Sequence, residues 1–400
     1  MTTINLGKDV YIKGRIGWRG LNKSEYLEKS EYRIINATAL MDGFVDWNNC
    51  GYISKERFDE SSEIMLQEGD ILISKDGTLG KIGYVKNLNF PCTVASGIFV
   101  LRNIHTDYID FDYLYHLLKS SIFKDFIRRN KADGSTINHL YQRDLENFEI
   151  DLPDINIQRK ISKILNYLDE KIDNNKKINN KIDSFLGTIY SYWFLQYNFP
   201  DDSNHPYYQN NGKLSSTEEG KKIPENFEIR LLSDFCNIFT GHKDVNQSKD
   251  FGKYKFYSCA PEFKYSDEKL YDGKAILISG NGSYTGRTIF VDDSFDLYQR
   301  TYACTPKDCN ILEYIYYCLK YQFVPRVSGG THGSAIPYIV YNDIAKERII
   351  YNEKIVNKFT KIAKPLMNLY TTNEKEILNI EEIKKMLLPM LMNGQIEIIG

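Results

Sequence analysis

The chain has 400 residues, of which 42% are hydrophobic, and this supports two to four domains with substantial cores. Its formal net charge of −2 excludes a polycation, so any nucleic-acid surface has to be a local patch. Seven cysteines without a C-x-x-C pair indicate reduced thiols, and six histidines without ligand spacing give no support to a metal site. Because the chain shows neither a signal-peptide core nor a membrane-length apolar run, we expect a cytoplasmic protein that binds no membrane.

Residues 1–152 are predicted to form a mixed α/β globule. Short β-like runs at Asp70–Ser74, Ile82–Val85 and Gly97–Leu101 precede a helical stretch at Tyr108–Asn130, and glycine-rich turns separate them. This alternation is typical of a compact α/β or α+β domain.

Residues 153–198 are predicted to form a long amphipathic helix. Apolar residues recur at helical spacing, and heptads place them at positions a and d. The a positions are Ile161, Leu168, Asn175, Ile182 and Ile189, and the d positions are Ile164, Ile178 and Phe185.

The same order of segments returns in the second half of the chain. The segment "ILISKDGTLGKIGYV" matches "ILISGNGSYTGRTIFV", "DYLYHLLK" matches "EYIYYCLK", and "GSTINHLYQRDL" matches "GSAIPYIVYNDI". The offset falls only from 205 residues at the first match to 198 in the helix. The chain is therefore a tandem duplication, with a second α/β globule at residues 199–351 and a second helix with a tail at residues 352–400.

The two helices are expected to pair as an antiparallel coiled coil that relates the repeats by a pseudo-twofold axis. In the second helix Phe359, Leu366, Asn373, Ile380 and Leu387 take position a, and Ile362, Leu369, Ile383 and Met390 take position d. Asn175 and Asn373 occupy the middle a positions, so we expect their side chains to lie close together and to fix the register. The alternative is that each asparagine faces solvent at a defect in the seam.

The glycine-rich turns do not fit a nucleotide site. "GNGSYTG" has G-x-G-x-x-x-G spacing, "DGTLGK" lacks the first glycine and the Ser/Thr of a P-loop, and β-type runs rather than helices follow both. The sequence also lacks G-x-S-x-G and the Asn-Pro-Pro-aromatic tetrad of an amino-methyltransferase. We therefore expect a protein that is not an enzyme and that binds no cofactor or metal itself.

Several segments resemble the specificity (S) subunit of Type I restriction-modification enzymes. They are "GDILISKDGTLGKIGYV", "GSTINHLYQRDLENFEIDLPDINIQRKISKIL", "IYSYWF", "STEEGKKIPENFEIRLLSDF" and "LLPMLMNGQIEI". The likeness covers nearly the whole chain. Phe227 stands where the family usually has Trp.

The resemblance implies two target-recognition domains, residues 1–152 and 199–351, that each recognise one half of an asymmetric bipartite site in double-stranded DNA. It implies that conserved helices 153–198 and 352–400 space the domains and dock two methyltransferase (M) subunits. S-adenosylmethionine would bind to the M subunits, and ATP and Mg would bind to two restriction (R) subunits in systems that have them. Two alternatives stay open: a Type IIB-like or methylation-only system, and a coiled-coil scaffold for protein interactions.

Candidate DNA-binding residues come from a comparison of the two repeats. Matching residues should frame the domain or contact phosphates, whereas differing residues at equivalent places should contact bases. The comparison aligns Cys92–Gly97 with Tyr298–Ala303. The matching candidates are Lys81, Ser135, Arg287 and Ser334, the differing candidates are Lys75, Asp76, Asn138, His139, Asn281, Gln299, Arg300 and Tyr338, and the flanking candidates are Arg15, Arg19, His242 and Lys243.

Overall fold

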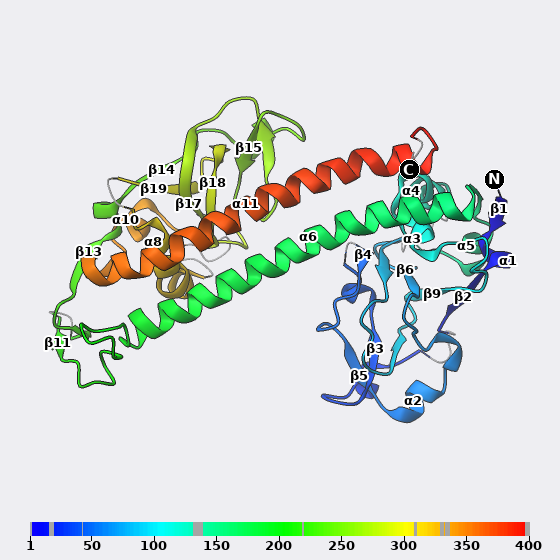
Figure 1. The fold of residues 1–400 in the computed structure, drawn as a ribbon, viewed down its shortest axis with the longest axis horizontal. Coiled ribbons are helices and arrows are strands. Elements are labelled where there is room, and N and C mark those ends of the chain that lie inside the picture. The colour runs from blue at the N-terminus through cyan, green and yellow to red at the C-terminus, as the bar shows by residue number, and fades with distance from the viewer. Residues whose placement is uncertain are drawn as a thin grey trace. The chain divides into compact units, whose positions relative to one another are not determined.

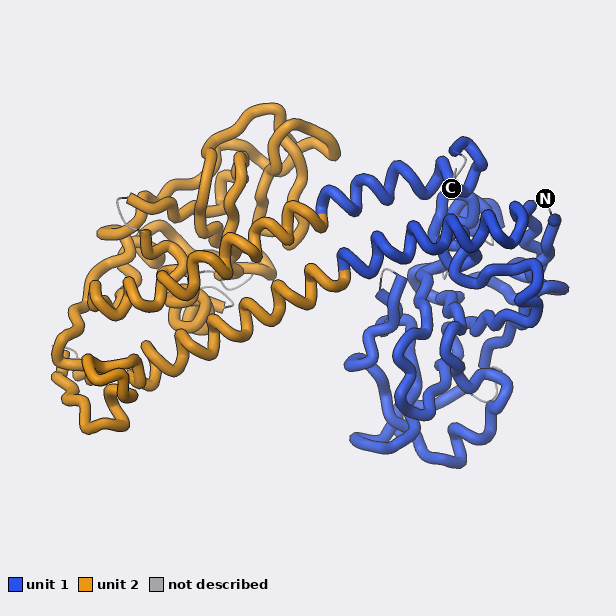
Figure 2. Tube along the Cα trace, viewed as in Figure 1, with its two compact units in different colours: residues 1–172, 378–400 blue, residues 173–377 orange. Residues whose placement is uncertain are grey.

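The computed structural model describes residues 2–15, 20–41, 43–130, 139–217, 220–307, 310–328, 332 and 337–396. The chain divides into two compact units, unit 1 with residues 1–172 and 378–400 and unit 2 with residues 173–377 (Figure 2). Each unit contains one α/β domain and a part of each long helix. The units cut across both helices because each domain packs against segments of both; the predicted domain boundaries stay predictions.

The domain of unit 1, called the first domain below, combines short strands with short helices before its long helix (Figure 1). Its strands are β1 (Thr2–Asn5), β2 (Val10–Gly14), β3 (Tyr32–Ile35), β4 (Gly43–Phe44), β5 (Gly51–Ile53), β6 (Ile71–Ser74), β7 (Ile82–Tyr84), β8 (Cys92–Val94), β9 (Ile98–Asn103) and β10 (Glu149–Leu152). Its α-helices are α1 (Leu6–Asp9), α2 (Lys55–Asp59), α3 (Phe111–Lys119), α4 (Ser121–Arg129) and α5 (Gln142–Glu146).

The domain of unit 2, called the second domain below, repeats this order with longer strands. Its strands are β11 (Leu214–Ser216), β12 (Lys222–Pro224), β13 (Glu228–Leu231), β14 (Cys236–Thr240), β15 (Tyr254–Tyr257), β16 (Lys264–Ser266), β17 (Tyr271–Ser279), β18 (Thr288–Leu297), β19 (Thr301–Pro306) and β20 (Arg348–Tyr351). Its helices are α7 (Leu232–Phe235), α8 (Leu312–Cys318), α9 (Val324–Val327) and α10 (Tyr341–Ala345), with a π-helical turn at Leu319–Phe323 between α8 and α9.

One sheet topology underlies both domains. The strand order β2-β9-β6-β7 in the first domain corresponds to β14-β19-β17-β18 in the second. The registers match as well, since Ile71 pairs with Leu101 where Ile276 pairs with Cys304. All four residues of β6 are buried, as expected for an apolar run in the middle of a covered sheet. These matches confirm a tandem repeat of mixed α/β domains.

The two domains differ in the strand that follows the glycine-rich turn. The long strand β18 of the second domain pairs antiparallel with β17 and then parallel with β15. The first domain divides the same path into β7, which pairs with β6, and β8, which pairs with β3. Thr93 and Asp296 occupy equivalent places, because each faces the middle residue of a parallel ladder.

The helical stretch predicted at residues 108–130 is two helices, α3 and α4. Ser120, between them, has an extended backbone with ψ 171°, and its N–H bonds to the carbonyl of Leu117. Asp110 caps α3 by accepting the N–H of Tyr113 at 2.8 Å. The sequence signal missed the break because apolar residues continue on one face across it.

The long helices are α6 (Ile155–Tyr190), followed by a π-helical turn at Ser191–Leu195, and α11 (Glu353–Met392). Within unit 1, Ile161 lies in one core cluster with Leu391, and further along α6 Asp169 pairs with Lys384. Within unit 2, Asn175 donates to Glu376 and Asn373 donates to Asn179. In each unit, residues further along α6 therefore contact residues nearer the start of α11, so the two helices pack antiparallel. None of the described helices is long and apolar enough to cross a membrane.

The predicted d positions of both heptads are wrong by one residue. Most of the residues predicted at d, including Ile178, Phe185 and Leu369, are exposed. The side chains that are buried instead lie one position after the predicted d positions. Together with the predicted a positions, they recur at alternating spacings of three and four residues. They are Leu165, Ile172, Asn179 and Leu186 in α6 and Val356, Ala363 and Ile377 in α11. A second apolar stripe, one residue before the seam, makes the two registers hard to separate by pattern alone.

Asparagines form a buried polar layer in the helix pair of unit 2. Asn175 and Asn373 are 3% and 5% exposed, so neither faces solvent. Asn373 donates to the Asn179 amide oxygen at 2.9 Å, and Asn175 donates to Glu376 at 2.8 Å. Asn373 thus bonds to Asn179, which lies about one turn from Asn175, and Asn175 bonds to Glu376, which lies about one turn from Asn373. Their role in fixing the register stays a prediction.

Candidate nucleic-acid interface

The glycine-rich turn of each domain closes on itself through the same backbone hydrogen bonds. In both domains the backbone N–H of the last strand residue before the turn donates to the carbonyl of the basic residue that ends the turn. The carbonyl of the same strand residue accepts from the N–H of the glycine that precedes this basic residue. These bonds join Ser74 with Lys81 at 3.0 Å and Gly80 at 2.9 Å, and Ser279 with Arg287 at 2.9 Å and Gly286 at 2.8 Å. The turns are hairpins rather than phosphate loops, because strands β7 and β18 follow them.

Glycine is required in these turns by their backbone conformation. Gly77 and Gly80 have φ of 69° and 73°, and Gly282 and Gly286 have φ of 80° and 84°. An L side chain in this left-handed region is strained, which explains why both repeats keep glycine at both places.

A second set of backbone bonds joins three chain segments at this end of each domain. The residue that follows β6 or β17 donates its backbone N–H to a carbonyl in the turn before β9 or β19. Its own carbonyl accepts a hydrogen bond from a backbone N–H in the segment before α5 or α10. The bonds run from Lys75 N–H to Gly97 O and from Leu140 N–H to Lys75 O, and from Gly280 N–H to Arg300 O and from Ile339 N–H to Gly280 O, all at 2.9 Å. We call this end of each domain the tip.

The hydrogen bonds correct the alignment of the two repeats at the tip. Gly97 and Arg300 hold the same place, as do Lys75 and Gly280. The expected alignment of Cys92–Gly97 with Tyr298–Ala303 is therefore wrong by three residues. The error arises because the connection between the hairpin and the next aligned strand position is three residues longer in the first domain. This connection is formed by residues 85–91 in the first domain and by residues 291–294 in the second.

The tip of the first domain carries a carboxylate–imidazole pair beside a shielded cation. Asp76 and His139 form an isolated bridge, and the imidazole Nδ1 of His139 contacts the Asp76 carboxylate. The Lys75 ammonium lies 4.9 Å from the centre of the Phe99 ring, a cation–π contact. Partial burial lowers the pKa of Lys75. The structure thus brings three of the sequence candidates of this domain together.

The tip of the second domain presents neutral groups and one arginine. Asn281 and Tyr338 form the bridge that Asp76 and His139 form in the first domain. Gln299 donates to Asp244 at 3.1 Å, and the Tyr338 ring stacks on His332 at 5.2 Å.

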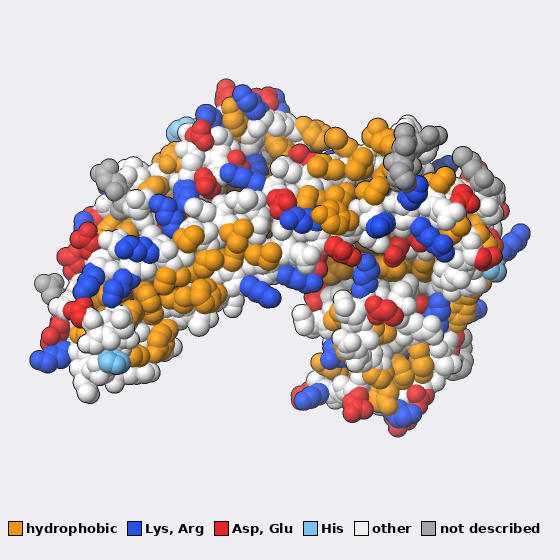
Figure 3. Space-filling view, in the orientation of Figure 1, with side chains coloured by type: hydrophobic (Ala, Val, Ile, Leu, Met, Phe, Trp, Pro, Cys, Tyr) orange, Lys and Arg blue, Asp and Glu red, His pale blue; other side chains and the backbone are white. Residues whose placement is uncertain are grey.

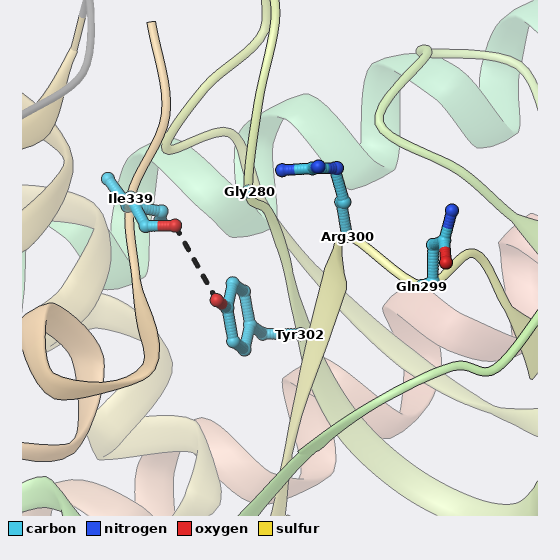
Figure 4. Close-up of a pocket in the computed structure, with 5 residues that line it drawn as sticks. All are labelled: Gly280, Gln299, Arg300, Tyr302 and Ile339. Carbon is cyan, nitrogen blue, oxygen red and sulfur yellow. Dashed lines mark hydrogen bonds between the residues drawn. The ribbon is translucent and has the colours of Figure 1, made fainter. Parts of the chain in front are cut away.

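A hollow opens at this second tip between the strand ends. Its lining residues are Gly280, Gln299, Arg300, Tyr302 and Ile339. Figure 4 shows the guanidinium of Arg300 extending toward Gly280, whereas the Gln299 side chain points away from it.

Three residues predicted to contact DNA make structural contacts within their own domains, and their binding to DNA stays a prediction. Arg15 is 2% exposed, and it donates to Val94 O at 3.0 Å and to Ser61 Oγ at 3.2 Å beneath the tip. Lys243 has a comparable role in the second domain, where its ammonium lies 2.7 Å from Asp296.

Arg287 and Lys243 are occupied by contacts within the second domain. The Arg287 guanidinium donates to the carbonyls of Ala260 and Pro261 at 2.9 and 3.1 Å. Lys243 also lies 2.9 Å from Glu268, and these carboxylates raise the pKa of Lys243 against the effect of its burial. Both cations are therefore held in place by contacts within the second domain.

The remaining candidates divide into accessible residues and residues outside the described part of the chain. His242 is exposed and Lys81 is half-buried, so a DNA backbone could reach either side chain. The candidates that lie outside the described residues are Arg19, Ser135, Asn138 and Ser334.

Sequence comparison did not identify the aromatic residue beside each tip. Phe99 and Tyr302 occupy equivalent places on β9 and β19, two residues after Gly97 and Arg300. Phe99 lies under Lys75, and the Tyr302 hydroxyl donates to Ile339 O at 3.5 Å. An aromatic residue at the same place in both repeats was the available signal, and the three-residue alignment error hid it.

The described residues of the tips offer hydrogen-bond donors and acceptors to a ligand. Within the described ranges, no group of three or more His, Cys, Asp or Glu side chains could hold a metal ion. The tips instead combine a rigid backbone frame with side chains that differ between the domains. Two domains of one fold with different side chains on one frame define a class of protein suited to recognising two different targets.

Comparison with known proteins identifies the family. The family model described as "Type I restriction modification DNA specificity domain" matches residues 13–184 and 224–385, one match in each repeat. Because these matches cover most of the chain, the protein belongs to this family.

Individual relatives agree with this assignment. The chain is 26% identical over 368 residues to the Type I restriction enzyme MjaIX specificity subunit of Methanocaldococcus jannaschii, a match that covers 86% of this chain and 82% of the relative. It is 25% identical over 380 residues to the MjaVIII specificity subunit of the same organism, with 84% and 81% covered. Its fold is similar to the crystal structure of a Type I S subunit from M. genitalium, with a TM-score of 0.62 at 18% identity and with 98% and 95% of the chains covered.

Proposed function

We propose that this chain is the DNA-specificity subunit of a Type I restriction-modification complex and that each domain recognises one half of a split DNA site. The observation that carries the proposal is the pair of tips, which share a backbone frame but present different side chains. In this proposal the chain does no chemistry. S-adenosylmethionine belongs to two partner M subunits, and ATP and Mg belong to R subunits where a system has them.

The distribution of shared and differing groups supports two recognition surfaces. Phosphates are the same in every half-site, whereas base edges differ, so sequence recognition needs variable side chains on a constant support. The constant support is the hydrogen-bonded frame around Ser74 in the first domain and Ser279 in the second. The variable side chains include the carboxylate–imidazole pair Asp76–His139 and its counterpart, the amide–phenol pair Asn281–Tyr338.

The exposed stripe on the helix pair supports docking of M subunits. In unit 2, Ile178, Phe185 and Leu369 are 41%, 52% and 45% exposed. Each lies one residue before a seam position, and in an antiparallel pair such positions of the two helices lie along the same side. Figure 3 shows hydrophobic side chains along both helices of this unit. An exposed apolar stripe of this kind is typical of a protein interface.

The opposite side of the helix pair holds the second domain. Asp183, one residue after the seam, accepts hydrogen bonds from the Lys320 ammonium at 2.6 Å and from the Tyr317 hydroxyl at 3.3 Å. Met367, in the equivalent place on α11, is 1% exposed and contacts Tyr317. Because one side of the pair carries the domain, the apolar stripe on the other side remains accessible to a partner.

The proposed function is tested by mapping adenine methylation in DNA from cells that express this chain with its M subunit. We expect a motif of two short half-sites separated by a fixed gap of unspecified bases. Replacing residues 1–152 by the first domain of another family member should change one half-site and leave the other unchanged. Absence of methylation, or one continuous motif, would contradict the proposal and favour a protein-interaction scaffold.

The docking surface is tested by the variant Phe185→Ser, with Lys181→Ser as the matched control on the exposed surface of the same helix. Loss of the apolar contact should weaken binding of the M subunit by about tenfold or more, since burying a large apolar side chain contributes roughly 1.5–3 kcal/mol. The control should bind normally, and both variants should unfold at the wild-type temperature. Equal binding by the two variants would exclude this stripe as the docking surface.

A further inference from the structure

The second tip differs from the first in the strand that supplies its cation. In the first domain Lys75 follows β6 and faces Gly97, whereas in the second domain Gly280 follows β17 and faces Arg300. The same pair of backbone positions thus holds one cation and one glycine in each domain, in reversed order. The exchange changes where the charge is presented while the frame stays the same.

Close packing of the backbone fixes the position of Arg300. A Cβ added to Gly280 would lie 2.2 Å from the Arg300 carbonyl oxygen, so no larger residue fits at this place without movement. The Arg300 carbonyl also accepts from the Cys259 thiol at 3.4 Å, and Thr301 N–H closes the turn onto Tyr298 O at 2.9 Å. The arginine therefore extends from a rigid support, which lowers the entropy lost on binding.

The guanidinium of Arg300 is available for a ligand. It has no hydrogen-bond or ion-pair partner among the described residues, whereas Lys243 and Arg287 are held by carboxylates and carbonyls. The Arg300 side chain is exposed at the rim of the hollow (Figure 4). Its planar group of N–H donors matches the two acceptors, O6 and N7, that guanine presents in the major groove.

A base is a better partner for Arg300 than a phosphate. Phosphates are common to both half-sites, so contacts to them do not require the domains to differ. Arg300 instead occupies a place where the first domain has Gly97 and therefore no side chain to reach a base. Its neighbour Gln299 is held by Asp244, and its side chain points away from Gly280.

We propose that Arg300 recognises a guanine in the half-site of the second domain. This inference rests on the proposed function and deepens it by naming one specificity-determining residue and the base it contacts. A bidentate contact of this kind discriminates against other bases by roughly tenfold to a hundredfold.

The test compares Arg300→Ala and Arg300→Lys with the control Arg348→Ala, which removes an exposed arginine from β20. Each variant is expressed with the M subunit and its methylated motif is mapped. For both Arg300 variants we expect one fixed G·C pair of the second half-site to become degenerate, while the first half-site and the gap stay unchanged. The lysine variant retains the charge but loses the planar donor group, so it should also relax the motif.

Binding of the M–S complex to DNA at several salt concentrations separates base recognition from phosphate contact. If Arg300 contacts a phosphate, Arg300→Ala should weaken binding to all sequences alike and reduce the salt slope by about one, with the motif unchanged. That result would overturn the Arg300 proposal while a split motif would still support the proposed function. A wild-type complex that methylates no split motif would overturn both.

Discussion

The tips of the two domains have the same backbone and different chemistry. The first tip carries the carboxylate–imidazole pair Asp76–His139 and the shielded cation Lys75, whereas the second carries Asn281 and Tyr338 beside the exposed Arg300. Their hydrogen-bonded frames agree bond for bond. The comparison teaches that backbone bonds maintain the tip, so the side chains on it can differ without a change of fold.

The largest expected effect comes from removing the buried cation beneath the first tip. Arg15→Ala should lower the free energy of unfolding of the first domain by about 3 kcal/mol or more, since it leaves a cavity and unsatisfied acceptors at Val94 and Ser61. Lys243→Ala should cost the second domain about 2 kcal/mol, because its ammonium is partly exposed and its loss leaves Asp296 unpaired.

Calorimetry of the full chain measures both effects. Equal losses in the two variants would contradict the view that Arg15 is the more deeply buried support.

Acid should destabilise the first domain through His116, whose equivalent in the second domain is Tyr317. Burial, with a smaller contribution from Lys384, lowers the pKa of His116 to about 4 from its ordinary value near 6.5. As the pH falls, the unfolded chain therefore binds this proton before the folded chain does. The stabilisation is complete above pH 6.5 and is lost as the pH falls toward 4, and the full loss amounts to about 3 kcal/mol.

The variant His116→Gln isolates this effect, because glutamine can still bond to Asn166, which lies 2.9 Å from the imidazole. Unfolding by denaturant between pH 7 and pH 4 should show a smaller loss of stability in the variant than in the wild type. Parallel pH curves would exclude His116 as the source.

The smallest expected effects come from the turn glycines and should be alike in the two domains. Gly77→Ala and Gly282→Ala should each cost about 1 kcal/mol, since only the left-handed backbone is strained. Gly80→Ala and Gly286→Ala should each cost about 2 kcal/mol, because the new methyl group also meets Ile127 or Val327 at 2.6 or 2.8 Å. The unfolding temperatures of the four variants should fall in this order. If equivalent variants of the two domains differed more than the two variants within one domain, the expected likeness of the two turns would be contradicted.

The sequence predicted the repeat, the helices and the inner strands because periodicity and internal similarity record local structure. It did not predict the seam of the helices, since Ile178 and Phe185 form an exposed apolar stripe with the same period as the buried one. It also missed the buried role of Arg15, because a charged residue in a basic segment resembles a surface contact. The equivalence of Gly97 and Arg300 became visible only through hydrogen bonds, since an insertion of three residues shifts the alignment.

The backbone frame of the tips also bears on how such a protein changes over generations. A substitution at Arg300 alters a side chain, whereas the bonds that hold the turn, from Gly280 N–H to Arg300 O and from Thr301 N–H to Tyr298 O, use main-chain atoms. Selection for a new target therefore acts on the side chains of the tip, whereas selection for a stable fold acts on the main-chain atoms of the same residues. A lineage can acquire a new half-site in one step at the tip, while the inherited domain, its helices and its partners stay as they were.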